Sequence, residues 1–140
     1  MTQSDIKKIV ENLIQTFLDA GKISIDLRKK GLTKEIKSDN TPVSNGDLEV
    51  NKILSKKILS LTPNIPIVSE ETSENKSKNN LENFWLIDPI DGTYDYINDL
   101  DEFTINAGLI IQKKPVAGLI YAPAKNRMFY SYGDDFSFEL

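Results

Sequence analysis

The sequence predicts an α+β fold in which two N-terminal helices pack on a mostly antiparallel sheet. Two segments in the first half carry apolar residues at three- and four-residue steps, which is typical of helices with one buried face. From residue 103 onward, apolar runs alternate with short turn-forming segments, the pattern of an antiparallel meander. A chain of 140 residues is long enough for one domain with its own core.

The first helix is predicted over residues 4 to 30. Gly31 favours a left-handed stop after it, and Gly21 weakens its middle by ~1 kcal/mol relative to alanine. We expect this helix to serve packing alone. Its apolar face consists of Ile6, Ile9, Val10, Leu13, Ile14, Phe17 and Leu18.

Residues 32 to 38 are expected to be extended, and residues 37 to 47 are rich in turn formers. The second helix then begins at Ser44, Asn45 or Asp47, each of which can cap a helix. It is expected to end at Leu61, before a threonine and a proline.

Strands are predicted from apolar, branched and aromatic runs. A short edge strand is expected at 65–68, and a strand buried on both faces at 84–87. Residues 72–80 are polar, and we expect a mobile loop there that could gate a site. The strands of the meander are predicted at 103–112, 116–121, 127–132 and 136–140.

The segment 84–93 changes abruptly from apolar residues to two acids, a proline, a glycine and a threonine. Asp88 and Asp91 are therefore expected at the C-terminal end of a strand. Side chains three apart in an extended chain point to opposite faces, so their convergence requires a turn. Pro89 and Gly92 are residues that favour such a turn.

Two converging carboxylates repel each other unless a cation lies between them, and Mg²⁺ is the hard divalent ion that prefers oxygen ligands. Gly92 and Thr93 would present backbone amides beside the acids, which favours an anion site. A cation site next to an anion site predicts phosphate-ester hydrolysis. The simpler alternative is that these acids only form turns after a strand.

Composition narrows the class of function. The net charge of −4, from 17 basic and 21 acidic residues, argues against binding driven by nucleic-acid phosphates. The chain has no cysteine and no histidine, which excludes thiolate nucleophiles, Ser-His-Asp relays and ordinary zinc sites. No apolar run approaches the length of a membrane span, so a cytoplasmic location is expected, with the inner membrane face as an alternative.

The string Asp-Pro-Ile-Asp-Gly-Thr at 88–93 resembles the signature of the inositol monophosphatase superfamily, whose members are lithium-sensitive, magnesium-dependent phosphatases. Haloacid-dehalogenase phosphatases carry a similar string, but their aspartates are two residues apart rather than three. Further segments, at 39–47, 102–106 and 121–123, look more like the bisphosphate nucleotidases than the inositol phosphatases.

The sequence departs from the family pattern at three positions, two within 39–47 and one directly after the 88–93 string. Ser44 replaces the usual threonine, and Gly46 replaces the usual alanine. Tyr94 replaces a lysine of the nucleotidase subgroup, and Tyr96, where the subgroup has phenylalanine, keeps the aromatic type.

The resemblance implies the layered α/β sandwich of the inositol monophosphatase and fructose-1,6-bisphosphatase type. It covers essentially the whole chain, but only about the first half of the family's length. Residues 1–140 are thus expected to form an N-terminal catalytic lobe that lacks the C-terminal lobe and its metal-binding aspartate. The apolar surface exposed by a half-fold predicts that the chain aggregates or forms a homo-oligomer.

The resemblance also implies the metal ligands. Glu70, Asp88 and the backbone carbonyl of Ile90 would hold one Mg²⁺, and Asp88 with Asp91 would hold a second, for two or three ions in all. Glu70 would be supported by the adjacent Glu71. Taken without the resemblance, two adjacent acids at a strand end simply indicate solvent exposure.

In the family, a hydroxyl and an acid orient the attacking water. The matching residues here are Thr93 with Glu70 or Asp47, and Asp47 as a mere helix cap is the alternative. Asp91 and the amides of Gly92 and Thr93 would hold the substrate phosphate.

The activity implied is removal of the 3′-phosphate of adenosine 3′,5′-bisphosphate, giving AMP and phosphate, a reaction connected with sulfur assimilation. One alternative is an inositol or sugar monophosphatase. Another, of a different class, is a metal- or phosphate-binding fragment without turnover.

Overall fold

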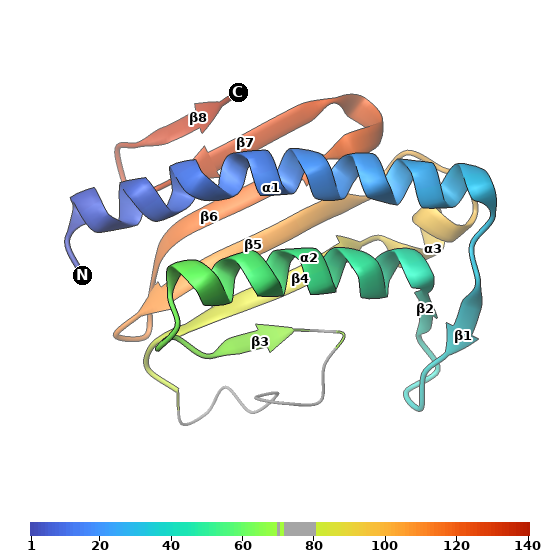
Figure 1. Cartoon of the computed structure of the whole chain (residues 1–140), viewed down its shortest axis with the longest axis horizontal. Coiled ribbons are helices and arrows are strands. Elements are labelled where there is room, and N and C mark those ends of the chain that lie inside the picture. The colour runs from blue at the N-terminus through green and yellow to red at the C-terminus, as the bar shows by residue number, and fades with distance from the viewer. Residues whose placement is uncertain (70, 72–80) are drawn as a thin grey trace.

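The computed structural model describes residues 1–69, 71 and 81–140. Two long helices, α1 (Gln3–Lys30) and α2 (Asn45–Leu61), lie side by side on one face of a six-stranded sheet (Figure 1). This arrangement confirms the predicted α+β fold. The strands are β3 (Ile67–Ser69), β4 (Phe84–Asp91), β5 (Thr104–Ile111), β6 (Lys114–Ala122), β7 (Arg127–Ser131) and β8 (Ser137–Glu139).

Helix α1 has the limits that its sequence predicts. Thr2 and Asp5 form a reciprocal capping box at its start, in which each side chain accepts the other residue's amide. Gly31 ends the helix with φ +96°, a value that side chains disfavour. The predicted apolar face is the buried one, since Val10, Leu13 and Phe17 are fully buried.

Between the helices, the chain forms a hairpin that the sequence did not predict in full. The strand expected in residues 32–38 is β1 (Lys34–Ile36), and it pairs with β2 (Pro42–Ser44). The sequence predicts a loop where β2 lies, because three residues are too few to show an apolar period. The hairpin leads directly into α2, so it determines where that helix begins.

The sheet has the order β3-β4-β5-β6-β7-β8. Strands β3 and β4 pair in parallel, and all the other neighbours pair antiparallel, as a mostly antiparallel sheet requires. The tight turn between β5 and β6 places Gln112 and Lys113 at positive φ, the backbone conformation of a two-residue hairpin loop. The short 3₁₀ helix η1 (Pro123–Lys125) makes the next turn.

The core lies between the helices and the sheet. Trp85, Ile87, Leu109 and Leu119 point toward the helices and are fully buried. The Trp85 indole N–H donates to the Thr62 hydroxyl at the end of α2, at 3.0 Å, so its polar atom is paired within the core.

Within the described residues no helix covers the other face of the sheet, which we call the open face. Leu86 lies there and is only half-buried, so the expectation that 84–87 is buried on both faces is wrong. A hollow of about 690 Å³ lies on this face. Its lining includes Leu86, Asp88, Asn106, Gly108, Gly118, Ile120 and Phe129.

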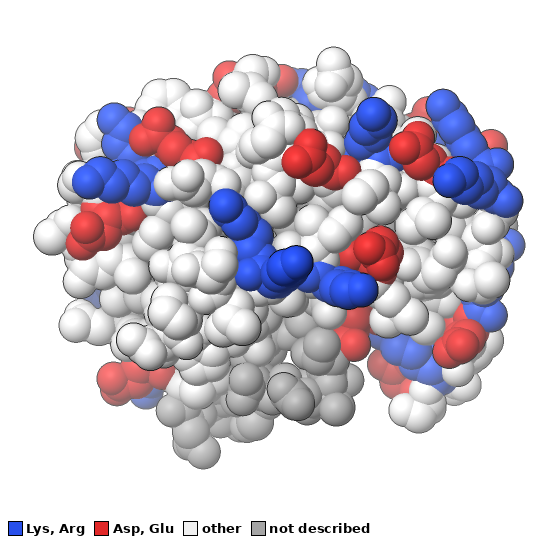
Figure 2. Space-filling view, in the orientation of Figure 1, with Lys and Arg blue, Asp and Glu red and all other residues white. Residues whose placement is uncertain are grey.

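The outer surface of the helices is a solvated one. Figure 2 shows acidic and basic side chains interspersed over the face that carries α1 and α2. None of the helices in the described part of the chain is both long and apolar enough to cross a membrane.

Candidate active site

The two aspartates of the 88–93 string lie on a bulged strand rather than around a turn. Strand β4 continues through both, with Asp88 opposite Asn106 and Asp91 opposite Thr104 on β5. Three steps along β4 thus match two steps along β5, so β4 carries one extra residue. The expectation of a turn between the two aspartates is wrong, because the extra residue of the bulge changes which face Asp91 points to.

The bulge brings both carboxylates to one face. Asn106 and Thr104 are two apart in a strand and therefore share a face, and directly opposed residues share it too. Asp88 and Asp91 consequently project to the same side of the sheet, the open face. Asp88 is half-buried beside the hollow described above, and Asp91 is exposed at the strand end.

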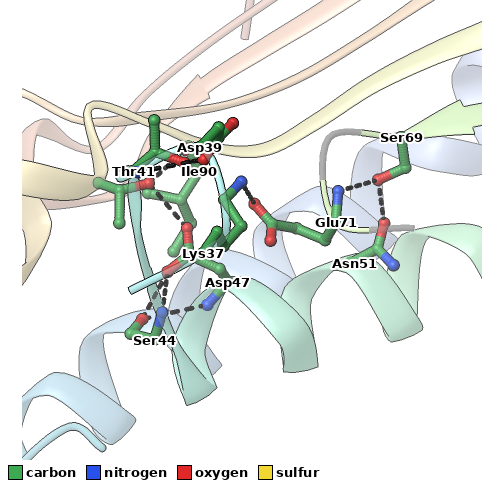
Figure 3. Close-up of polar contacts among 10 residues, drawn as sticks. Lys37, Asp39, Thr41, Ser44, Asp47, Asn51, Ser69, Glu71 and Ile90 are labelled. Atoms are coloured by element: carbon green, nitrogen blue, oxygen red, sulfur yellow. Dashed lines mark hydrogen bonds and ion pairs between the residues drawn. The ribbon is translucent and has the colours of Figure 1, made fainter. Parts of the chain in front are cut away.

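The start of α2 supplies a third carboxylate, that of Asp47. Ser44 is the N-cap, and its amide and hydroxyl both donate to Asp47 Oδ2, at 2.9 and 2.5 Å (Figure 3). The Asp47 amide donates back to the Ser44 hydroxyl at 3.3 Å. The capping role that remained open from the sequence is therefore real, and the Asp47 side chain is fully buried.

Asp47 also contacts the 88–93 string, from 46 residues away in the sequence. The Thr93 hydroxyl lies 2.8 Å from Asp47 Oδ1, to which it donates, and 3.1 Å from the Ile90 carbonyl oxygen, a second acceptor. The structure thus joins three predicted site residues in one hydrogen-bonded group. The two interpretations of Asp47 are compatible, because one carboxylate oxygen caps the helix and the other binds Thr93.

Gly92 forms the bend between β4 and the short helix α3 (Thr93–Ile97). Its φ of +88° and ψ of +42° lie in the left-handed region. A Cβ at this position would lie 2.7 Å from the carbonyl oxygen of Glu102, which is a backbone atom. Only glycine fits both constraints, so the chain can approach Glu102 closely here.

Replacing Gly92 by alanine is expected to lower the free energy of unfolding by about 2–4 kcal/mol, from left-handed strain plus overpacking. Urea unfolding followed by circular dichroism measures the loss. Gly31→Ala is the matched control, because Gly31 also has a positive φ, but among the described residues no atom beyond its chain neighbours lies within 4 Å of its Cβ position. Equal losses in the two variants would mean that the contact with Glu102 contributes nothing.

A second polar group lies beside Asp47, on the side of α2 that faces β3. The Ser69 hydroxyl donates to the Asn51 amide oxygen, and the Glu71 amide donates to Ser69 Oγ at 3.3 Å. Lys37, at the end of the β1–β2 hairpin, reaches across to Glu71, with 3.8 Å between Nζ and Oε1 (Figure 3). The Glu71 side chain is only 5 % exposed, so this acid is held near the site rather than in solvent.

Comparison with known proteins assigns the chain to a family. The model of the inositol monophosphatase family matches residues 5–135, nearly the whole chain. The chain belongs to the inositol monophosphatase family.

Relatives of known function include bisphosphate nucleotidases. The 3′(2′),5′-bisphosphate nucleotidase CysQ of Haemophilus influenzae is 38 % identical over 117 residues, which are 82 % of this chain and 44 % of the relative. CysQ of Buchnera aphidicola is 34 % identical over 132 residues, 92 % of this chain and 50 % of the relative. The chain therefore spans about half the length of these relatives.

Solved structures of the family have the same fold. The suppressor protein SuhB of Bartonella henselae matches 94 % of this chain and 52 % of its own, with a TM-score of 0.83 and 23 % identity. An IMPase/NADP phosphatase determined with Mg²⁺ and phosphate matches 96 % of this chain and 51 % of its own, with a TM-score of 0.78 and 20 % identity. The layered sandwich expected from the resemblance is thus confirmed for this family member.

The structure brings some of the expected site residues together and leaves one out. Asp47, Ile90 and Thr93 form one bonded group, and Asp88 and Asp91 share a face. Glu70 lies outside the described residues, as does the loop expected at 72–80. Among the residues that are described, no group of three or more acids is close enough to hold a metal ion.

Two residues of the polar group beside Asp47, Asn51 and Lys37, were not predicted from the sequence. Asn51 falls in the buried stripe of α2 with Asp47, Leu54 and Ile58, and a polar residue in such a stripe indicates a buried partner. No sequence pattern indicated that Lys37 lies at the site, because its contact with Glu71 depends on how the β1–β2 hairpin folds.

Proposed function

We propose that this chain is the N-terminal catalytic lobe of a magnesium-dependent phosphatase of the bisphosphate nucleotidase type. The reaction would remove the 3′-phosphate of adenosine 3′,5′-bisphosphate and release AMP and phosphate. The observation that carries the proposal is the bulge in β4, which places Asp88 and Asp91 on one face beside the Ile90–Thr93–Asp47 group. The CysQ relatives favour the nucleotide as substrate.

The donor atoms present suit a hard divalent cation. Asp88 and Asp91 supply carboxylates, and the Ile90 carbonyl oxygen, which accepts a hydrogen bond from Thr93, has two lone pairs. Oxygen ligands of this kind are those that Mg²⁺ prefers. We propose these three residues and Glu70 as its ligands, with two or three ions in the complete site. When bound, the metal would acidify water and neutralise charge on the phosphate.

Thr93 and Asp47 would hold the attacking water. The Thr93 hydroxyl donates a hydrogen bond to Asp47 Oδ1, so the lone pairs of its oxygen can accept a hydrogen bond from water. Two hydrogen bonds from Ser44 fix the orientation of the buried Asp47 carboxylate, so that Oδ1 stays directed at Thr93. Glu70 is proposed as a second acid on the same water.

The substrate phosphate would lie at the bend that Gly92 forms. The left-handed conformation of this residue turns the chain out of β4, and the amides of Gly92 and Thr93 follow the last residue of that strand. Amide donors of this kind bind phosphate oxygens. Asp91 is proposed to reach the phosphate through the metal that it helps to hold.

Phosphate release by the purified chain tests this proposal. We expect release from adenosine 3′,5′-bisphosphate that requires Mg²⁺, is inhibited by lithium and is much slower with inositol 1-phosphate. The reverse preference would favour an inositol or sugar monophosphatase. Release that persists in excess EDTA would contradict the metal-dependent mechanism.

A binding lobe without turnover is the second candidate, because the chain spans about half the length of its relatives. In that case the chain would bind Mg²⁺ or phosphate, and hydrolysis would appear only after addition of the polypeptide that corresponds to the other half. Full turnover by residues 1–140 alone would exclude this candidate. Association of the chain with itself stays a prediction, supported by apolar Ile120 and Phe129 on the open face.

A further inference from the structure

Gly46 is the place where α2 approaches α3. A Cβ on Gly46 would lie 2.2 Å from the hydroxyl oxygen of Tyr96 and 2.6 Å from Cε2 of its ring. Gly46 lies within α2 and its φ is not positive, so its backbone does not require glycine. Alanine would be the better helix former here, and the space taken by the Tyr96 side chain explains the glycine.

Tyr96 is fixed in this position by its own contacts. The side chain is fully buried, and its hydroxyl donates to the Ser24 carbonyl of α1 at 2.7 Å. Its ring packs on Phe103, with 4.8 Å between the ring centres. Burial, followed by the negative charge of Asp47, raises the pKa of Tyr96, so the hydroxyl remains a proton donor.

These contacts connect Tyr96 to the candidate site. Tyr96 lies three residues after Thr93 on the same short helix, and Gly46 directly precedes Asp47 on α2. The Thr93–Asp47 hydrogen bond and the Tyr96–Gly46 contact therefore join the same two helices side by side.

We propose that Tyr96 is the positioning residue of the Thr93–Asp47 pair and that Gly46 is the complementary residue that admits its side chain. The hydroxyl of Tyr96 ties α3 to α1 and sets the distance from α3 to the start of α2. The catalytic meaning of the pair rests on the proposed function, but the coupling does not.

A double-mutant cycle tests the coupling through the melting temperature. Gly46→Ala is expected to lower it by about 5–10 °C through overpacking, and Tyr96→Phe by about 3–5 °C through loss of the hydrogen bond from Tyr96 to the Ser24 carbonyl. The double variant should melt above Gly46→Ala, because the ring without its bond to Ser24 can move away from the new methyl group. Losses that simply add would overturn the coupling.

Gly108→Ala is the matched control for adding a methyl group. The nearest atom to its Cβ position is the Ala117 carbonyl oxygen at 3.8 Å, an ordinary contact. Its melting temperature should stay within about 2 °C of the unmodified protein.

The positioning role is tested by a signal from Thr93 itself. In methyl spectra of the isotope-labelled chain, the Thr93 methyl resonance should move in Gly46→Ala and return toward its original place in the double variant. Tyr96→Phe should also move it, and this variant carries the test if Gly46→Ala does not fold. The methyl groups of Leu119, which is buried in β6, serve as the internal reference.

An unmoved Thr93 resonance in Tyr96→Phe would reduce Tyr96 to a packing residue and overturn the proposal. Neither measurement requires metal or turnover. Failure of the coupling would therefore leave the proposed phosphatase activity standing, and absence of that activity would leave the coupling intact.

Discussion

Asp47→Ala is expected to lower the free energy of unfolding by about 3 kcal/mol, a large part of the 5–15 kcal/mol that stabilises a typical domain. Asp47 accepts three hydrogen bonds, from the amide and hydroxyl of Ser44 and from the hydroxyl of Thr93. Alanine would leave the two Ser44 donors without this acceptor in a buried place, while the Thr93 hydroxyl would keep only the Ile90 carbonyl. Desolvated donors without partners cost more than the bonds themselves contribute. Urea unfolding followed by circular dichroism measures this loss.

Asp5→Ala is the matched control for this prediction. Thr2 and Asp5 form the same kind of capping box at the start of α1, but Asp5 is exposed. In the described part of the chain its side chain has no hydrogen bond to another element like the one that Asp47 makes to Thr93. Water can replace an exposed acceptor, so the loss should be clearly smaller than for Asp47. Equal losses would show that Asp47 acts as a helix cap alone and that its bond to Thr93 adds no stability.

Asp47→Ala is also expected to abolish phosphate release if the proposed function holds. The Thr93 hydroxyl would lose the shorter of its two hydrogen bonds and would point to the Ile90 carbonyl alone. A variant that still folds at low temperature but releases phosphate at the normal rate would contradict the proposed role of Asp47 in holding water.

Asp88→Asn is expected to weaken Mg²⁺ binding more than about 100-fold, since loss of even an outer partner of a ligand typically costs 10- to 100-fold. Asparagine keeps the shape of the side chain but removes its charge, which is the main attraction for a hard cation. The strand should therefore form as before, with position 88 still opposite Asn106. Calorimetric titration with Mg²⁺ measures the affinity directly.

Asp135→Asn provides the control for the change in net charge. Asp135 is exposed in the turn between β7 and β8, away from the acids of β4 in the sequence and in the sheet order. Its substitution should leave the affinity within about twofold, because exposed charges at a distance are screened. Unchanged affinity in Asp88→Asn would remove Asp88 from the set of proposed ligands.

The elements of this fold were accessible from the sequence because their signals are local. The apolar period of residues 4–30 and the glycine after it predicted the limits of α1, with an error of one residue at its start. Turn formers between apolar runs predicted the strands β5 to β8, whose ends differ from the prediction by at most two residues. Prediction failed for β2, whose three residues pair with β1 and carry no period of their own.

For the candidate site, the sequence supplied the residues but not the geometry that joins them. It identified Asp88, Asp91 and Thr93 from one short string, and Asp47 from a separate segment. It expected a turn between the aspartates, because a regular strand would send them to opposite faces. A bulge solves the same problem, and bulges depend on the pairing with a neighbouring strand.

The sequence by itself determined the family, the helix pair, the meander and the identity of the acids, since each depends on short-range pattern or on a contiguous string. Only the tertiary structure decided that Asp47 both caps α2 and binds Thr93, and that Gly46 makes room for Tyr96. These contacts join residues 46 to 50 positions apart, and their distances are set by how α1, α2 and α3 pack together. No local propensity encodes such a distance, because it results from the balance of all the contacts in the core.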